Sequence, residues 1–161
     1  MSKRSLGQRL LGYWNVLETK PGGKFLFSLA VGRFVRYSGS IGARVEELRP
    51  GYVRLTLKDR KKVRNHLRSV HAIAIANLGE LTTGLAVVSG LPPNTRCILR
   101  RMEASYDKKA RGLLTSTCRC DITSPSENAE HTIQAEIRDE SGDIVSVVSA
   151  LWVIGPEKTT T

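Results

Sequence analysis

The chain has 161 residues, of which 40% are hydrophobic and 25% charged, and its formal net charge is +10. These values are typical of a single soluble globular domain and exclude a disordered or fibrous protein. A helix that spans a bilayer needs roughly 20 apolar residues. The longest apolar stretch, residues 72–88, is interrupted by Asn77, Glu80, Thr82 and Thr83, so we expect no membrane-spanning helix.

The positive charge favours an acidic partner: nucleic acid, anionic lipid, the phosphates of coenzyme A or an acidic acyl carrier protein. Specific nucleic-acid binding is not expected, because the basic residues are scattered and no stacking or helix-turn-helix pattern occurs. The three cysteines, Cys97, Cys118 and Cys120, are expected to be reduced thiols, which indicates a cytoplasmic protein. Because a metal site would need more ligands nearby, no metal is predicted.

Two short helices are predicted before residue 40, separated by Pro21-Gly22-Gly23. The apolar residues of these segments recur at helical spacing: Leu6, Leu10, Trp14 and Leu17, then Phe25, Leu26, Leu29, Phe34 and Val35. We expect residues 1–39 to form a helical extension that packs on the following domain. The acid-poor start with Lys3, Arg4 and Arg9 also fits a targeting segment or a helix on a membrane surface, and this alternative stays open.

From Ser40 onward the apolar period changes to two, which predicts strands. Ile41, Ala43 and Val45 would lie on one face of a first strand, and a type II turn at Arg49-Pro50-Gly51-Tyr52 would lead into the second. A basic loop over residues 60–68 precedes an apolar helix over about residues 70–88. Four more strands are predicted at residues 95–106, 111–122, 132–138 and 144–154.

This order of elements predicts an α+β fold, because one antiparallel sheet must curve around a helix that is apolar on nearly every side. The domain is expected to cover residues 40–155, followed by a tail at 156–161. On the helix, Ile73, Asn77, Glu80 and Gly84 share one stripe. A carboxylate on such a helix needs water, a partner or a chemical role, and solvent at the edge of the helix is the alternative explanation for Glu80.

The segment from Asn65 to Ala72, with Leu78-Gly79-Glu80 beyond it, resembles the motif of PaaI-type hotdog thioesterases. That motif has an Asn six residues before a His, small residues after the His, and an acid nine residues beyond it. The spacings from Asn65 to His71 and from His71 to Glu80 match. The resemblance is to the PaaI-like and YiiD C-terminal-like branch, and it implies a hotdog fold over about residues 40–154.

The resemblance implies a role for each motif residue. Glu80 would be the nucleophile or the base that activates water, and Asn65 would orient the attacking group. The backbone N–H of Ala72, at a helix N-terminus, could polarise a thioester carbonyl. His71 is expected to shape the loop. Arg64, Arg68, Ile73, Asn77 and Thr83 are candidate substrate-binding residues.

Two positions depart from the family pattern and weaken the assignment of catalysis. Ile73 stands where a second glycine is common, and Arg68 replaces a glycine that is usual in the loop before the helix. The basic residues near this loop would attract the phosphates of coenzyme A, or else form a solvated loop.

If Ala72 and Glu80 act on one thioester, helix geometry predicts a homodimer; the expected assembly is a homodimer or a dimer of dimers. Glu80 lies eight residues beyond Ala72, which is roughly 12 Å along one helix. One carbonyl cannot contact both groups, so each site would combine two protomers around a two-fold axis.

The predicted function is hydrolysis of acyl-CoA or acyl carrier protein thioesters, with coenzyme A as part of the substrate and no further cofactor. The alternative is a non-catalytic module that binds acyl-CoA or lipid. The acyl chain length cannot be read from these residues, although an apolar channel lined by the first two helices would favour long chains.

Overall fold

The computed structural model describes residues 5–157. Lys3 and Arg4 of the predicted basic start, and residues 158–161 of the predicted tail, lie outside the described residues.

Two helices precede the first strand, and a third lies between the second and third strands. The elements are α1 (Leu6–Leu17), α2 (Gly23–Phe34), the short 3-10 helix η1 (Ser38–Ile41), β1 (Arg44–Arg49), β2 (Tyr52–Lys58), the 3-10 helix η2 (Lys61–Val63), α3 (Ala72–Gly90), β3 (Thr95–Tyr106), β4 (Leu113–Arg119), β5 (Ala129–Arg138) and β6 (Ile144–Pro156). The predicted order of two strands, one helix and four strands is confirmed.

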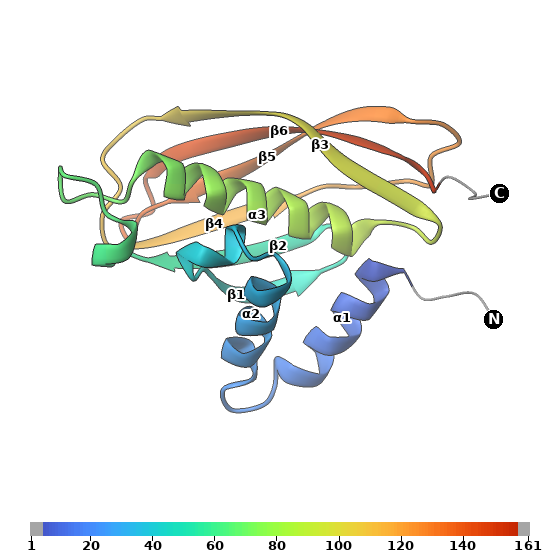
Figure 1. The fold of residues 1–161 in the computed structure, drawn as a ribbon, viewed down its shortest axis with the longest axis horizontal. Coiled ribbons are helices and arrows are strands. Elements are labelled where there is room, and N and C mark those ends of the chain that lie inside the picture. Colours follow the sequence, from blue (N-terminus) through green and yellow to red (C-terminus); the bar gives the residue numbers. More distant parts are fainter. Residues whose placement is uncertain (1–4, 158–161) are drawn as a thin grey trace.

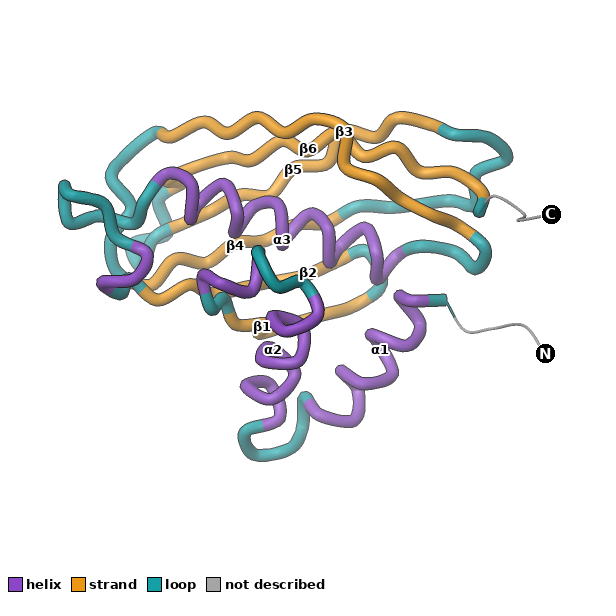
Figure 2. The backbone as a smooth tube through the Cα atoms, in the orientation of Figure 1, coloured by secondary structure: helices purple, strands orange, loops and turns teal. Residues whose placement is uncertain are grey.

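All six strands form one antiparallel sheet in the order β1-β2-β4-β5-β6-β3. The sheet curves around α3, which packs against every strand (Figures 1 and 2). This is the hotdog fold that the sequence predicts. The strands β1 and β3 are its two edges.

The central helix is buried because its sequence carries apolar or small residues on almost every side. Thirteen of its 19 residues are buried, including Leu78, Ala86 and Val87. Among the described residues, α3 alone is long and apolar enough to cross a membrane, but 67% of its apolar window is buried inside the fold. It is therefore the core helix of this domain.

The first strand differs from the prediction. Ile41 does not begin a strand; it ends η1, and Gly42 then turns the chain with φ 66° before β1 starts at Arg44. A β-bulge between Val45 and Glu47 also breaks the period of two. The predicted turn into β2 has Gly51 at φ 69°, as a type II turn requires.

Helices α1 and α2 form a V below α3 (Figure 1) and belong to the same hydrophobic core as the sheet. Trp14 and Phe27 close the V by an edge-to-face contact with 5.0 Å between ring centroids. The start of α1 lies directly on the end of α3, because a Cβ at Gly7 would overlap the carbonyl oxygen of Val88. The extension is therefore fixed to the domain at both helices.

Candidate active site

Glu80 lies on the face of α3 that points away from the sheet, toward the V of α1 and α2. Its side chain is partly buried, and its Oε2 accepts a hydrogen bond of 2.9 Å from the hydroxyl of Ser38 on η1. No basic group of residues 5–157 lies within ion-pair distance of this carboxylate. Glu80 is therefore a partly buried acid held by a neutral hydroxyl.

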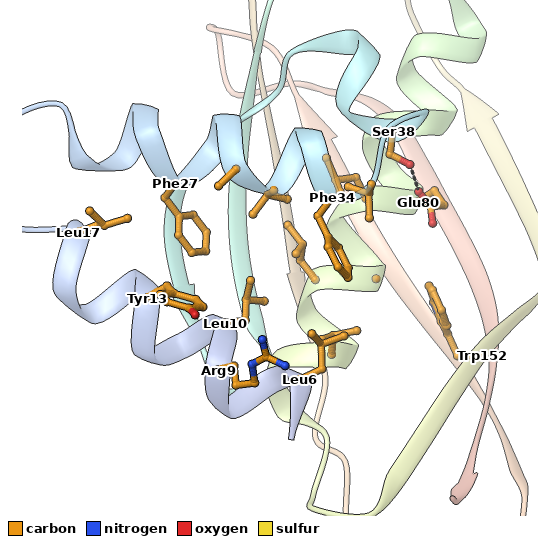
Figure 3. A pocket seen from close by; sticks show the side chains of 17 residues that line it. Leu6, Arg9, Leu10, Tyr13, Leu17, Phe27, Phe34, Ser38, Glu80 and Trp152 are labelled. Carbon is orange, nitrogen blue, oxygen red and sulfur yellow. Dashed lines mark hydrogen bonds between the residues drawn. The ribbon is translucent and has the colours of Figure 1, made fainter. Parts of the chain in front are cut away.

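The carboxylate forms part of the wall of an apolar cavity of about 470 Å³ between α1, α2, α3 and β6 (Figure 3). Gly84 lies one turn from Glu80 and packs beside Trp152: a Cβ there would make ordinary van der Waals contact with the Trp152 ring at 3.5 Å and with Oε1 of Glu80 at 4.0 Å. The indole N–H of Trp152 is buried and has no hydrogen-bond partner among the described residues. The size of the cavity is within the range of small-molecule sites, roughly 300–1,000 Å³.

Asn65 organises the loop that leads into α3. Its Oδ1 accepts hydrogen bonds from the backbone N–H of Leu67 at 2.9 Å, and from the N–H and hydroxyl of Ser69, both at 3.2 Å. The carbonyl oxygen of the Asn65 side chain is thus occupied by the loop. Only the NH₂ end of this side chain is free to contact an attacking group.

His71 is the N-cap of α3, where its Nδ1 accepts a hydrogen bond of 3.1 Å from the N–H of Ile73. This contact uses one of the free N–H groups that begin every helix. The N–H of Ala72 donates no hydrogen bond to any group within residues 5–157. The arrangement therefore leaves Ala72 N–H open at the positive end of the helix dipole.

Arg64 makes an ion pair of 2.6 Å with Asp59. This ion pair connects the loop before α3 to the residue that follows β2. The hydrogen bond from Arg64 holds the pKa of Asp59 below its usual value. Arg68 is exposed and has φ 55°, a left-handed conformation that glycine adopts without strain. That conformation explains why glycine is usual at this position in the family that the motif resembles.

A second, smaller depression of about 230 Å³ lies at the start of α3. It brings together Arg64, His71, Ile73 and Asn77, with Ile73 58% exposed. Thr83 lines neither this depression nor the larger cavity. It is fully buried, and its hydroxyl donates to the backbone carbonyl of Glu80 at 3.1 Å, so a direct contact with substrate is not available to it.

The structure keeps Ala72 and Glu80 of one chain apart, because α3 runs without interruption between them. Eight residues of helix correspond to roughly 12 Å. The predicted site residues thus form two groups in each chain: the loop with the helix N-terminus, and Glu80 with its cavity.

The described residues contain no cluster of three or more His, Cys, Asp or Glu side chains suited to a metal ion. Burial raises the pKa of the Cys118 thiol to about 12 and that of Cys120 to about 11. These thiols are therefore inert near neutral pH.

A family model described as a domain of unknown function, DUF4442, matches residues 23–154. The chain belongs to this family. The matched region of the DUF4442 family begins at α2 and includes Asn65, Ala72 and Glu80, whereas α1 precedes it. No curated protein sequence matches the chain.

Solved structures share the fold of this DUF4442 protein. A structural-genomics protein named without an activity is 27% identical, with a TM-score of 0.78 over 93% of this chain and 97% of its own. A protein of unknown function from Pseudomonas aeruginosa, described as a probable thioesterase, is 25% identical with a TM-score of 0.69, over 81% and 91% of the two chains. A thioesterase enzyme from Staphylococcus aureus has 18% identity and a TM-score of 0.65, over 75% and 99%.

Two residues of the candidate site in this DUF4442 protein are not predicted from the sequence. Ser38 bonds Glu80 across 42 positions of sequence, and nothing in its polar surroundings marks it. Trp152 is read only as part of a strand, although its ring packs beside Gly84. The glycine at position 84 is the one signal in the sequence that a bulky ring from another element could pack against this part of the helix.

Proposed function

We propose that the protein hydrolyses acyl thioesters and that Glu80 is the catalytic carboxylate. The observation that carries this proposal is the carboxylate itself, which is partly buried in the wall of the cavity and has no ion-pair partner among residues 5–157. The motif spacing of the hotdog thioesterases and the probable thioesterase from Pseudomonas aeruginosa support the same class of reaction.

In this mechanism Glu80 takes a proton from water while the water oxygen attacks the thioester carbonyl. The tetrahedral intermediate carries negative charge on the former carbonyl oxygen, which the N–H of Ala72 stabilises. Collapse breaks the C–S bond, and the thiolate takes the proton from Glu80. Direct attack by the Glu80 carboxylate would instead give an anhydride, which water then hydrolyses.

The two halves of the site meet if two chains pair around a two-fold axis, so that Ala72 and Asn65 of the partner subunit face Glu80. The edge strand β3 supports this pairing, because it has 12 residues and exposes Ile98, Met102 and Tyr106 to solvent. The unpaired backbone groups of a long exposed edge strand are a template for pairing with another chain.

The test is a steady-state assay on a panel of acyl-CoA thioesters. Glu80→Gln should lower kcat at least 100-fold, because it removes the base while keeping the shape of the side chain. Glu127→Gln, which neutralises an exposed loop glutamate, is the matched control and should keep full activity. Equal rates in the wild type and Glu80→Gln would refute the proposal.

A non-catalytic acyl-CoA-binding or lipid-binding module is the second candidate. It is favoured by Ile73, whose exposed side chain follows the open N–H of Ala72 and stands where a second glycine is common in the family that the motif resembles. This candidate predicts calorimetric binding of acyl-CoA by the wild type with no turnover. Ile73→Gly would then be expected to create or raise hydrolysis.

A further inference from the structure

We infer that the cavity between α1, α2 and α3 holds the acyl tail, and that the preferred substrate carries an unbranched aliphatic chain of about 10 to 14 carbons. The inference rests on the proposed function, which concerns the thioester group, and extends it to the acyl tail of the substrate.

The lining of the cavity is apolar except for Ser38 and Glu80 at one side and for Arg9 and Tyr13 of α1. Ser38 and Glu80 lie together at one side; from Glu80 the apolar wall continues along α3 to Val88, and Leu17 and Phe27 line the cavity in the V (Figure 3). The remaining lining includes Leu6, Leu10, Val31 and Leu85. A linear chain with a polar head fits this distribution, since the head would stay near Glu80 and the tail would be removed from water.

The dimensions of the cavity set the chain length. Along α3 its wall runs from Glu80 to Val88, eight residues or roughly 12 Å. An extended chain advances about 1.2 Å per bond, so this distance takes about ten bonds. At about 30 Å³ for each water-sized group, the volume of about 470 Å³ leaves room for a few more carbons if the chain bends.

The cavity does not collapse, because its walls are fixed. Gly7 holds α1 against the end of α3, and the Trp14–Phe27 contact closes the V. The side chains of Tyr13 and Phe34 are 62% and 75% exposed, so they stand at an opening to solvent rather than in the core. A preformed apolar cavity with an open side is suited to a flexible chain.

The first experiment fills the cavity away from Glu80. Leu10→Trp should lower kcat/KM for dodecanoyl-CoA at least tenfold, while kcat/KM for butanoyl-CoA stays within twofold. Val16→Trp places the same side chain on the exposed face of α1, outside the cavity, and should change neither value. In the wild type each added methylene should raise kcat/KM about fourfold up to the filled length.

Ala30→Phe is a second cavity-filling variant, which tests the inference if Leu10→Trp fails to fold. Ala30 lines the cavity but is exposed on its outer side, so the larger ring is accommodated without disturbing the core. Parallel losses with butanoyl-CoA and dodecanoyl-CoA in both variants, or no loss with dodecanoyl-CoA, would overturn the inference.

A binding experiment separates this inference from the proposed function. A neutral eleven-carbon alcohol brominated near the middle of its chain should quench the fluorescence of Trp152, whose ring lies beside Gly84, between Glu80 and Val88 along α3. Trp152 is one of two tryptophans in the chain. Quenching should disappear in Trp152→Phe and in Ala30→Phe, and persist in Val16→Trp. Quenching without thioester hydrolysis would refute the proposed function alone, whereas no quenching in the wild type would refute the tail site.

Discussion

At the scale of single residues, several side chains of the candidate site make hydrogen bonds or ion pairs that stabilise the loop and helix around them. His71 caps α3, the Oδ1 of Asn65 holds its loop, and Arg64 pairs with Asp59. Several residues of the motif therefore fix where α3 begins, in addition to any role in the reaction. Glu80 differs from the others, because within residues 5–157 the hydroxyl of Ser38 is the one group that donates a hydrogen bond to its carboxylate.

The strained backbone of Arg68 gives a prediction about stability. Arg68→Gly should raise the free energy of unfolding by about 0.5 to 1 kcal/mol, because a left-handed conformation costs a side-chain-bearing residue about 1–2 kcal/mol and glycine partly offsets this gain through its own entropy. Urea denaturation measures the change. Arg68→Ala keeps the Cβ and should give no gain; an equal gain in both variants would contradict the explanation from backbone strain.

The thiols of Cys118, which is buried, and Cys120, which is half-buried, give a prediction about pH. Because the pKa of Cys118 is about 12 and that of Cys120 about 11, both stay protonated at pH 8 in the folded protein. An unfolded thiol has a pKa of about 8.5. Alkylation at pH 8 should therefore be at least 100-fold slower at both residues in the native protein than in guanidinium, as measured by peptide mass spectrometry. The same difference makes the native state lose stability as the pH rises above about 8.5.

At the scale of elements, the prediction succeeds where turns interrupt the chain sharply. The strand β3 covers residues 95–106 as predicted, since Pro92 and Pro93 precede it and a polar loop follows. It fails at β1, where the apolar alternation continues through Ile41 although Gly42 has already turned the backbone. The alternation of apolar residues does not reveal a 3-10 turn or a β-bulge. Both change which residues face the core, but neither changes the types of residue in the segment.

The candidate site is predictable to the same extent. Asn65, His71 and Glu80 follow from local spacing along one loop and one helix. The same spacing predicts Thr83 as a substrate-binding residue, but its hydroxyl donates to the backbone carbonyl of Glu80 instead. Ser38 and Trp152 come from segments distant in sequence, so only the folded chain brings them to Glu80.

The contact of α1 with α3 predicts opposite effects at two glycines. Gly7→Ala should lower the free energy of unfolding by about 1–3 kcal/mol, because the added Cβ overlaps the backbone carbonyl of Val88. Gly12→Ala, on the same helix with nothing within 4 Å, should raise it by about 0.5 to 1 kcal/mol. Thermal and urea unfolding of the pair measure both; a stabilised Gly7→Ala would mean that α1 does not dock in this way.

At the scale of the whole molecule, the proposed shared site predicts complementation between two inactive variants. In a mixed dimer of Glu80→Gln and Asn65→Ala chains, one of the two sites would regain both residues. After unfolding and refolding of an equal mixture, about one quarter of the wild-type activity should return. Each variant refolded alone is the control, and no recovery in the mixture would place Asn65 and Glu80 of a working site in the same chain.

The hydrogen bond between Ser38 and Glu80 bears on how the protein could be shortened. A fragment that begins at residue 40, where the strands start, would lose the hydroxyl and two of the three helical walls around the carboxylate. It would also bare Leu81 and Leu85 to water. The smallest unit worth expressing for any study of the reaction therefore starts at α1, and a tag or fusion partner belongs at the opposite end of the chain.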